Sequence, residues 1–143
     1  MQSNPVRGKK NYQDQQLDAV KIPPHSVEAE QSVLGGLMLD NQTWDQIAGH
    51  ITESDFYRSD HRLIFRTIEA LANRNEPFDV LTVSEYLKSH QQLAEAGSDI
   101  YLFELAKNTP SSANIRAYAD IVRERSVVRQ LLSTSSQIAD MAY

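Results

Sequence analysis

The chain contains no cysteine, which excludes disulfide bonds, thiolate metal sites and a thiol nucleophile. No segment approaches the roughly 18 apolar residues that a membrane-spanning helix needs, and the N-terminus lacks the hydrophobic core of a signal peptide. Glycine and proline are scarce, with five of each in 143 residues, and no useful stretch alternates apolar and polar residues as a strand would. These absences predict a soluble, intracellular, all-α protein.

Sequence signatures of catalysis are also missing. The chain has neither a phosphate-binding Gly-x-x-x-x-Gly-Lys-Ser/Thr loop nor a Gly-x-Ser-x-Gly elbow. Its histidines lack the spacing that zinc sites use, so we interpret them as capping or surface residues. They are His25, His50, His61 and His90. Carboxylate pairs such as Glu28/Glu30 and Asp55/Asp60 are explained by helix starts, where negative charge is favourable. We therefore expect no catalytic residue, cofactor or metal in this chain.

The net charge of −5 is unevenly distributed. Residues 1–22 carry a formal charge of +2 and residues 113–143 carry +1, whereas residues 23–112 hold six basic and fourteen acidic side chains, a charge of −8. An acidic surface repels phosphate backbones. We therefore predict that this chain alone binds nucleic acid weakly or not at all.

The stretch from Pro23 to Asp40 organises the rest of the chain. Two prolines keep the entering backbone extended, and Ser26 is placed to cap a helix whose apolar residues form a wide stripe. Gly35 and Gly36 lie inside this helix, where each costs about 1 kcal/mol relative to alanine. We expect them to permit close approach of another helix. The alternative is that the helix breaks at Gly35.

Apolar spacing predicts four further short helices before residue 110. They span residues 44–51, 61–73 and 82–90, and a segment from a cap at Ser98 to a stop at Asn108. Ser59 or Asp60 is the expected cap of the second, and Thr82 with Glu85 the expected capping box of the third. The predicted fold is an all-α compact bundle of about five short helices followed by one long helix.

Residues 111–143 contain neither proline nor glycine, and apolar residues recur every three or four positions. A helix of about 30 residues would be roughly 45 Å long, more than the preceding bundle can cover. Four apolar side chains are the candidate self-association residues: Val128, Leu131, Leu132 and Ile138. Arg123, Arg125 and Arg129 lie among them and are expected to set the partner's register. The predicted organisation is a disordered polar tail (1–22), a helical globule (23–110) and a long helix (111–143).

Residues 23–40, PPHSVEAEQSVLGGLMLD, resemble the opening of the N-terminal domain of bacterial replicative DNA helicases, the DnaB family. Further segments that carry the resemblance are Asp55-Phe56-Tyr57, His61-Arg62-Leu63-Ile64-Phe65, Asn108-Thr109-Pro110 and Tyr118-Ala119-Asp120-Ile121-Val122-Arg123-Glu124-Arg125. The resemblance covers roughly residues 22–143 in order. One departure is Ala96-Gly97-Ser98-Asp99, where the family often has a second glycine.

The resemblance implies a non-catalytic collar domain in the cytoplasm. In this family the domain is a globule with a helical hairpin, six chains form a ring of three dimers, and the collar docks a DnaG-type primase and influences ring loading. Residues 111–143 correspond to the first arm of the hairpin. A helicase loader is a further expected partner, single-stranded DNA would pass through the full-length ring, and ATP and Mg²⁺ would bind a C-terminal domain absent from this sequence.

Two other hypotheses remain open. A free-standing helical protein-interaction adaptor would have no downstream Walker motif, so the sequence beyond residue 143 distinguishes it from the helicase. A helix-turn-helix DNA-binding module is conceivable over Leu81 to Leu93. Its recognition helix should be basic, but Glu85 balances Lys88 there, which disfavours this hypothesis.

Overall fold

The computed structural model describes residues 22–143, and over this range the chain is helical with no β-strand, which confirms the all-α prediction. The α-helices are α2 (Val27–Leu39), α3 (Trp44–Ile47), α4 (Ser59–Asn73), α5 (Val80–Ser89), α6 (Ser98–Lys107) and α7 (Ile115–Ala142), with short 3₁₀ helices η1 (Asn41–Thr43) and η2 (Glu53–Asp55). The tail predicted for residues 1–22 lies outside the described residues except for Ile22. No described helix is both long and apolar enough to cross a membrane.

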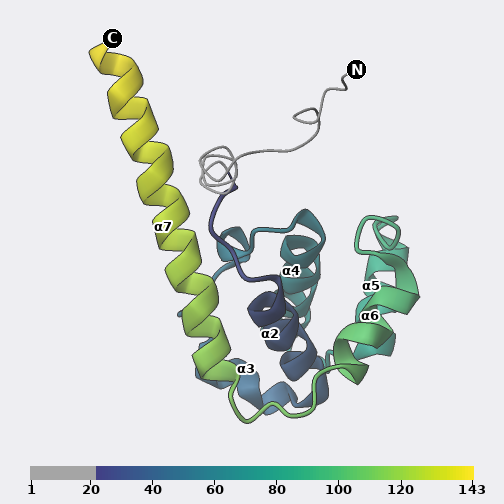
Figure 1. The fold of residues 1–143 in the computed structure, drawn as a ribbon. Coiled ribbons are helices and arrows are strands. Elements are labelled where there is room, and N and C mark those ends of the chain that lie inside the picture. The colour runs from purple at the N-terminus through teal and green to yellow at the C-terminus, as the bar shows by residue number, and fades with distance from the viewer. Residues whose placement is uncertain (1–21) are drawn as a thin grey trace, which may run out of the picture.

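Helix α2 lies at the centre of the molecule, between α7 on one side and α6 on the other, with α4 packed beside it (Figure 1). Ser26 caps it as expected, because the backbone N–H of Ala29 donates to Ser26 Oγ at 3.2 Å. The helix continues through both glycines to Leu39 without a break. Val33, Leu34 and Leu37 are fully buried, so α2 forms the axis of the core.

Helix α4 contributes the apolar stripe expected of it, and its Phe65 joins an aromatic cluster. The ring of Phe65 lies 4.9 Å from that of Phe56 and 5.6 Å from that of Trp44. Helix α3 is shorter than the predicted 44–51, because the backbone leaves the helical region at Ala48 and turns at Gly49 with φ +83°. A left-handed φ suits glycine and ends the helix.

The predicted cap of α5 at Thr82 is wrong. Asp79 is the N-cap, its carboxylate accepting from the Thr82 backbone N–H at 2.9 Å while the Asp79 N–H donates to Thr82 Oγ1 at 2.8 Å. Thr82 is therefore the last residue of the box rather than the first. The tertiary structure sets this start, since the Asn41 side chain holds both the N–H and the C=O of Phe78.

Two other helix starts also differ from the predicted caps. Helix α4 begins at Ser59 with Arg58 as N-cap, and the Asp60 carboxylate binds the Arg58 side chain. Helix α6 begins at Ser98 after Gly97, whose φ is +96°. In both places a local contact or a turn competes with the side-chain cap and moves the helix start by one or two residues.

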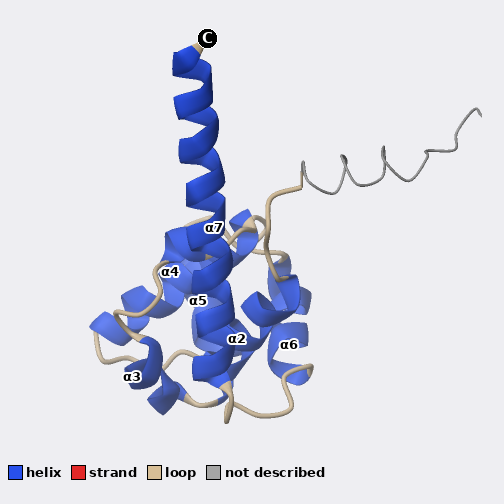
Figure 2. Ribbon diagram, turned by 60° about the vertical axis from the view of Figure 1, so that its left-hand side comes forward, coloured by secondary structure: helices blue, strands red, loops and turns tan. Residues whose placement is uncertain are grey.

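Helix α7 has two parts that differ in their surroundings. Its N-terminal part packs against α2, α3 and η2, and it buries Ile115, Ala119, Val122 and Ser126. The remainder, residues 127–142, extends beyond the rest of the molecule (Figure 2). We refer to residues 115–126 as the proximal segment and to residues 127–142 as the distal segment.

Candidate interaction site on the C-terminal helix

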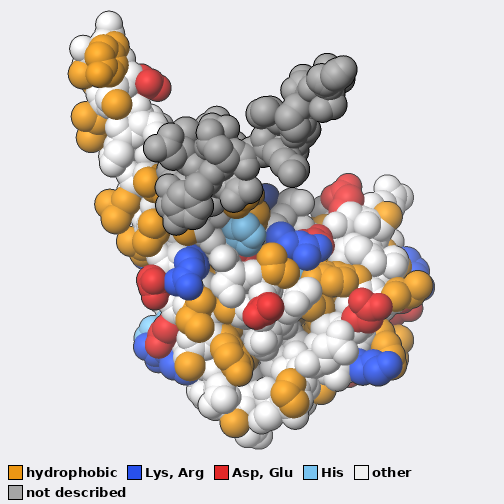
Figure 3. All heavy atoms as spheres, in the orientation of Figure 1, with side chains coloured by type: hydrophobic (Ala, Val, Ile, Leu, Met, Phe, Trp, Pro, Cys, Tyr) orange, Lys and Arg blue, Asp and Glu red, His pale blue; other side chains and the backbone are white. Residues whose placement is uncertain are grey.

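The predicted self-association residues lie on the distal segment with their side chains uncovered. Leu131 and Ile138 are each 62% exposed, Leu132 is 49% exposed and Val128 is 37% exposed. Hydrophobic side chains are visible along this projecting part of α7 (Figure 3). Burying a leucine or isoleucine contributes roughly 1.5–3 kcal/mol, so covering this surface with apolar side chains would be favourable.

The exposed apolar residues do not continue the buried stripe of α7. With about 100° of rotation per residue, Ile115, Ala119, Val122 and Ser126 share one side of the helix. The candidate residues lie about 110–150° away from the centre of that side. Distal positions that continue the buried side are polar, namely Ser133, Gln137 and Asp140. The exposed apolar residues therefore form a face offset from the fully buried side, and its edge at Val128 and Leu132 continues the row of Ile121, which packs against the core.

A buried carboxylate fixes the place where α7 crosses the globule. Asp55 in η2 is 1% exposed, and one of its oxygens accepts from both Arg123 Nη1 and Ser126 Oγ at 2.8 Å. The other oxygen accepts from the backbone N–H of Thr52 at 2.8 Å. A buried carboxylate is tolerated only when its oxygens are paired in this way.

Arg129 forms a second attachment at the start of the distal segment. It donates to the backbone oxygens of Pro24 at 2.8 Å and Asp55 at 2.6 Å, and its guanidinium lies 5.4 Å from the centre of the Tyr57 ring. His25 stacks on Tyr57 with ring centres 4.1 Å apart. The structure thus uses Arg129, like Arg123, for contacts within the chain rather than leaving it free for a partner's register. Among the described residues, the side chain of Arg125 has a hydrogen bond only with its neighbour Glu124.

The two glycines of α2 lie directly against other segments. A Cβ atom on Gly35 would lie 2.0 Å from Thr109 Oγ1 and 2.3 Å from the backbone oxygen of Leu105. At Gly36 a Cβ would lie 3.2 Å from the flexible end of Ile115 and at an ordinary contact distance, 3.7 Å, from Ser112 Cα. Thr109 is itself held there, since its hydroxyl donates to the Leu105 oxygen at 2.8 Å. Gly35 therefore has the stricter steric requirement of the two.

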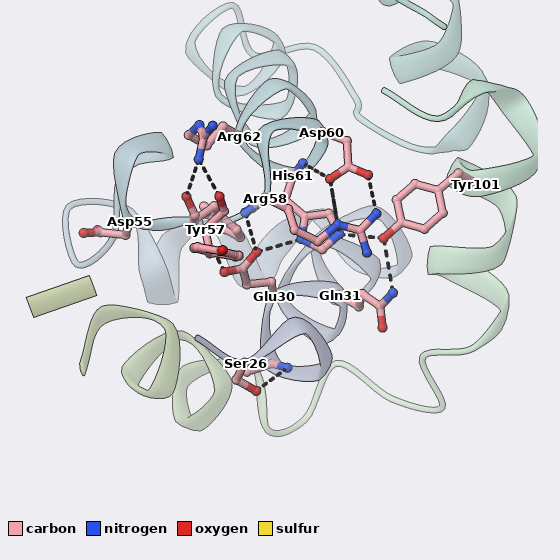
Figure 4. Close-up of polar contacts among 12 residues, drawn as sticks. Ser26, Glu30, Gln31, Asp55, Tyr57, Arg58, Asp60, His61, Arg62 and Tyr101 are labelled. Atoms are coloured by element: carbon pink, nitrogen blue, oxygen red, sulfur yellow. Dashed lines mark hydrogen bonds and ion pairs between the residues drawn. The ribbon is translucent and has the colours of Figure 1, made fainter. Parts of the chain in front are cut away.

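A second buried polar cluster joins α2, α4 and α6 (Figure 4). Glu30 and His61 are 1% and 0% exposed, and Glu30 Oε1 lies 2.7 Å from His61 Nδ1. A carboxylate can only accept, so Nδ1 carries the hydrogen, and the Tyr101 hydroxyl donates to Nε2 at 2.5 Å in the neutral imidazole. Gln31 donates to the Tyr101 oxygen at 3.2 Å, and the Tyr57 backbone N–H donates to Glu30 at 2.7 Å.

Both carboxylate oxygens of Glu30 and both ring nitrogens of His61 are paired within this cluster. Burial raises the pKa of Tyr101, and the hydrogen bond from Gln31 opposes that change only in part. The two-point hydrogen bond to the Asp60 carboxylate raises the pKa of Arg58. The groups hold one another and tie α2, α4 and α6 together, while Tyr101 and Gln31 also line an open pocket of about 210 Å³.

Interpreting the histidines as capping or surface residues was wrong for His61, whereas Glu30 and Asp55 do lie at helix starts as interpreted but are buried there. His61, Glu30 and Asp55 are all buried. Helix-start charges and isolated histidines are usually exposed, so local patterns favoured that interpretation. The sequence feature that could have pointed to these three residues was the resemblance to the DnaB family, because all three lie in segments that carry it. Within residues 22–143, no three His, Asp or Glu side chains form a cluster suited to a metal ion.

The fold is an all-α bundle with one projecting helix, and comparison with known proteins identifies its family. The chain belongs to the DnaB-like helicase N-terminal domain family, whose model matches residues 22–124. The replicative DNA helicase DnaB of Haemophilus influenzae is 48% identical over 130 residues, 91% of this chain. That of Geobacillus stearothermophilus is 42% identical over 128 residues, 90% of this chain. The resemblance noted from the sequence is confirmed.

Solved structures agree with this assignment. The N-terminal domain of DnaB helicase from Mycobacterium tuberculosis is 34% identical, with a TM-score of 0.83 and 85% of each chain covered. The corresponding Helicobacter pylori domain, described together with its interactions with primase, shares the fold at 23% identity and a TM-score of 0.69, with 93% of this chain and 98% of that chain covered. The chain spans 28% of the length of the two curated relatives named above.

Proposed function

We propose that this chain is the non-catalytic N-terminal collar of a replicative DNA helicase and that it mediates self-association into the hexameric ring. The observation that carries the self-association is the uncovered apolar face of the distal segment, formed by Val128, Leu131, Leu132 and Ile138. It is offset from the side on which α7 buries Ile115, Ala119, Val122 and Ser126 in its own globule. A second copy of the chain offers the same face and is a suitable cover for it.

We propose that this apolar face is covered when the α7 helices of two subunits pair. This pairing is the first step towards a ring of three dimers. The distal segment bears few charges, Arg129 and Asp140, and Arg129 is already engaged within the chain. Pairing would therefore bury mainly apolar side chains and require little desolvation of charge. Because the second hairpin arm lies outside this sequence, the contact should be weaker than in the longer protein.

Sedimentation velocity over a concentration series tests this proposal. The parent chain should shift from monomer to dimer as its concentration rises, and Leu132→Asp should remain monomeric because a carboxylate in an apolar interface is strongly unfavourable. Ser133→Asp is the matched control, since it adds the same charge on the side of the helix that continues the buried residues of the proximal segment, and it should still dimerise. A parent chain that stays monomeric at millimolar concentration would contradict the proposal.

Docking of a DnaG-type primase is the second part of the proposed role. The family membership supports it, and the related Helicobacter pylori domain is described with primase interactions. Titration calorimetry of this chain with the helicase-interacting domain of a primase should show binding that survives Leu132→Asp if docking is a property of the globule. No heat of binding at high micromolar concentrations would argue against docking by this part of the chain.

The remaining expectations concern the longer protein. In a longer, cytoplasmic helicase, segments beyond residues 1–143 would bind ATP and Mg²⁺, and single-stranded DNA would pass through the ring. A loader would act on that ring. The adaptor hypothesis makes the opposite prediction for the downstream coding sequence, which should then lack Walker motifs. Sequencing past residue 143 distinguishes the two.

A further inference from the structure

An open groove lies between α5 and α6, the two helices on the side of the molecule opposite α7 (Figure 1). Its volume is about 570 Å³, and its surface is mainly apolar. Leu81 of α5 forms one wall, and Ile100 and Phe103, one turn apart on α6, form the other. The groove is separate from the distal segment of α7 and from both buried polar clusters.

The apolar side chains of this groove are exposed to an unusual degree. Leu81 is 69% exposed, Ile100 is 71% exposed and Phe103 is 58% exposed. Only two other large apolar side chains in residues 22–126 are comparably exposed, Ile22 and Leu39. Single exposed apolar residues are ordinary, whereas a group of them around a hollow marks an interaction surface.

The core of the domain does not require these three residues. Helix α6 packs inward through Leu102 and Leu105, and α5 packs inward through Val83 and Leu87. The groove residues lie on the other faces of the two helices. Their size and apolar character therefore call for an occupant outside this globule.

The rim of the groove is acidic. Glu85 and Asp99 border it, and the single basic residue there, Lys88, is paired with Glu85 at 3.7 Å. Asp99 accepts a hydrogen bond from Ser84. Residues 79–107 as a whole carry five carboxylates against two lysines, a formal charge of −3. Figure 3 shows acidic, basic and hydrophobic side chains side by side over α5 and α6.

We propose that the α5–α6 groove binds a different protein through an amphipathic helix with apolar anchors on one face and lysine or arginine at its edges. A groove between two helices suits a third helix whose anchors recur every three or four residues. Charge complementarity at the acidic rim selects basic edges. A second copy of α7 fits poorly, because residues 127–143 contain only one basic and one acidic side chain. The proposal does not depend on the helicase role.

Two synthetic peptides of about 18 residues, long enough to form a helix, provide the probe. Both carry leucines at helical spacing, and one has lysines at the edges where the other has glutamates. Fluorescence anisotropy gives the affinities, and amide shifts of the ¹⁵N-labelled chain locate the site. The lysine peptide should shift amides around Leu81, Ile100 and Phe103, and it should bind at least about tenfold more tightly than the glutamate peptide at low salt.

Matched variants of the chain localise the contact. Phe103→Ala should weaken binding of the lysine peptide at least about tenfold, as expected for an apolar anchor. Leu131→Ala, at a similarly exposed position on α7, should leave the affinity unchanged. Ile100→Ala serves as the second groove variant if the amide spectrum shows that Phe103→Ala has not folded.

Three outcomes would overturn the proposal. Equal affinity for the two peptides would show that the acidic rim does not favour basic over acidic peptide edges. Amide shifts confined to α7, or binding lost with Leu131→Ala, would place the peptide on the distal segment. Self-association of the peptide-free chain that disappears with Phe103→Ala would assign the groove to a second copy.

Discussion

The two segments of α7 have similar helical patterns but opposite surroundings. In the proximal segment Val122 is 2% exposed, whereas six residues later Val128 is 37% exposed. The proximal face is covered by α2, α3 and η2, and Asp55 and Arg129 fix its crossing point. This difference shows that an apolar repeat along a helix indicates a tendency to be buried. The neighbouring elements determine which of its residues are in fact buried.

The largest effect is expected where the covered region is most tightly packed. Gly35→Ala should lower the free energy of unfolding by about 3 kcal/mol or more, because its Cβ would collide with the Leu105 backbone and Thr109. Helix propensity alone would predict a gain of about 1 kcal/mol. Chemical denaturation measures the difference, and Gly36→Ala, whose closest contact is a side-chain end, is the control with a smaller loss. Equal stability of Gly35→Ala and the parent would contradict the close packing.

Loss of the carboxylate that anchors the proximal segment should have the next largest effect. Asp55→Ala removes the acceptor of Ser126, Arg123 and the Thr52 N–H, so we expect a loss of about 3 kcal/mol. Ser126→Ala should cost only about 1 kcal/mol, since it removes one neutral donor. Thermal melts rank the two variants. A smaller loss for Asp55→Ala than for Ser126→Ala would show that the carboxylate is not the anchor.

The same substitution in the two segments tests the comparison directly. Val122→Ala should cost about 2 kcal/mol, from two buried methyl groups at about 0.8 kcal/mol each plus the cavity that they leave. Val128→Ala should change the stability of the monomer by less than about 0.5 kcal/mol. Urea unfolding at low micromolar concentration, where dimers dissociate, is the appropriate measurement. Equal losses at both positions would mean that the distal face is covered within one chain.

The smallest expected effect concerns Tyr101 and its dependence on pH. Tyr101→Phe removes the hydroxyl that joins α6 to His61, which should cost about 1 kcal/mol at neutral pH. Burial raises the pKa of Tyr101 above that of the unfolded chain, about 10. The stabilisation is therefore complete below about pH 10 and is lost as the pH rises towards the folded-state pKa.

Unfolding measured between pH 8 and 11 should show a smaller decline for Tyr101→Phe than for the parent. Tyr143→Phe, at the fully exposed end of α7, should follow the parent curve. If Tyr101→Phe also follows the parent, this hydroxyl does not contribute to the alkaline loss of stability.

The sequence by itself determined the helical class, the bundle followed by a long helix, and the family. These properties depend on periodic apolar residues, on proline and glycine at the boundaries, and on an ordered series of motifs, all of which can be read locally. The Ser26 cap is local in the same sense, because acceptor and donor lie three residues apart. Whether the predicted division at residue 110 corresponds to separate folding units stays a prediction.

Only the tertiary structure decided which polar residues are buried and which face of α7 remains open. Glu30 pairs with His61 across 31 positions and Asp55 with Ser126 across 71, so no local pattern distinguishes these carboxylates from surface ones. The start of α5 at Val80 likewise depends on Asn41 holding Phe78 from 37 positions away. Burial results from the packing of distant segments, and a residue's own neighbours in sequence do not specify it.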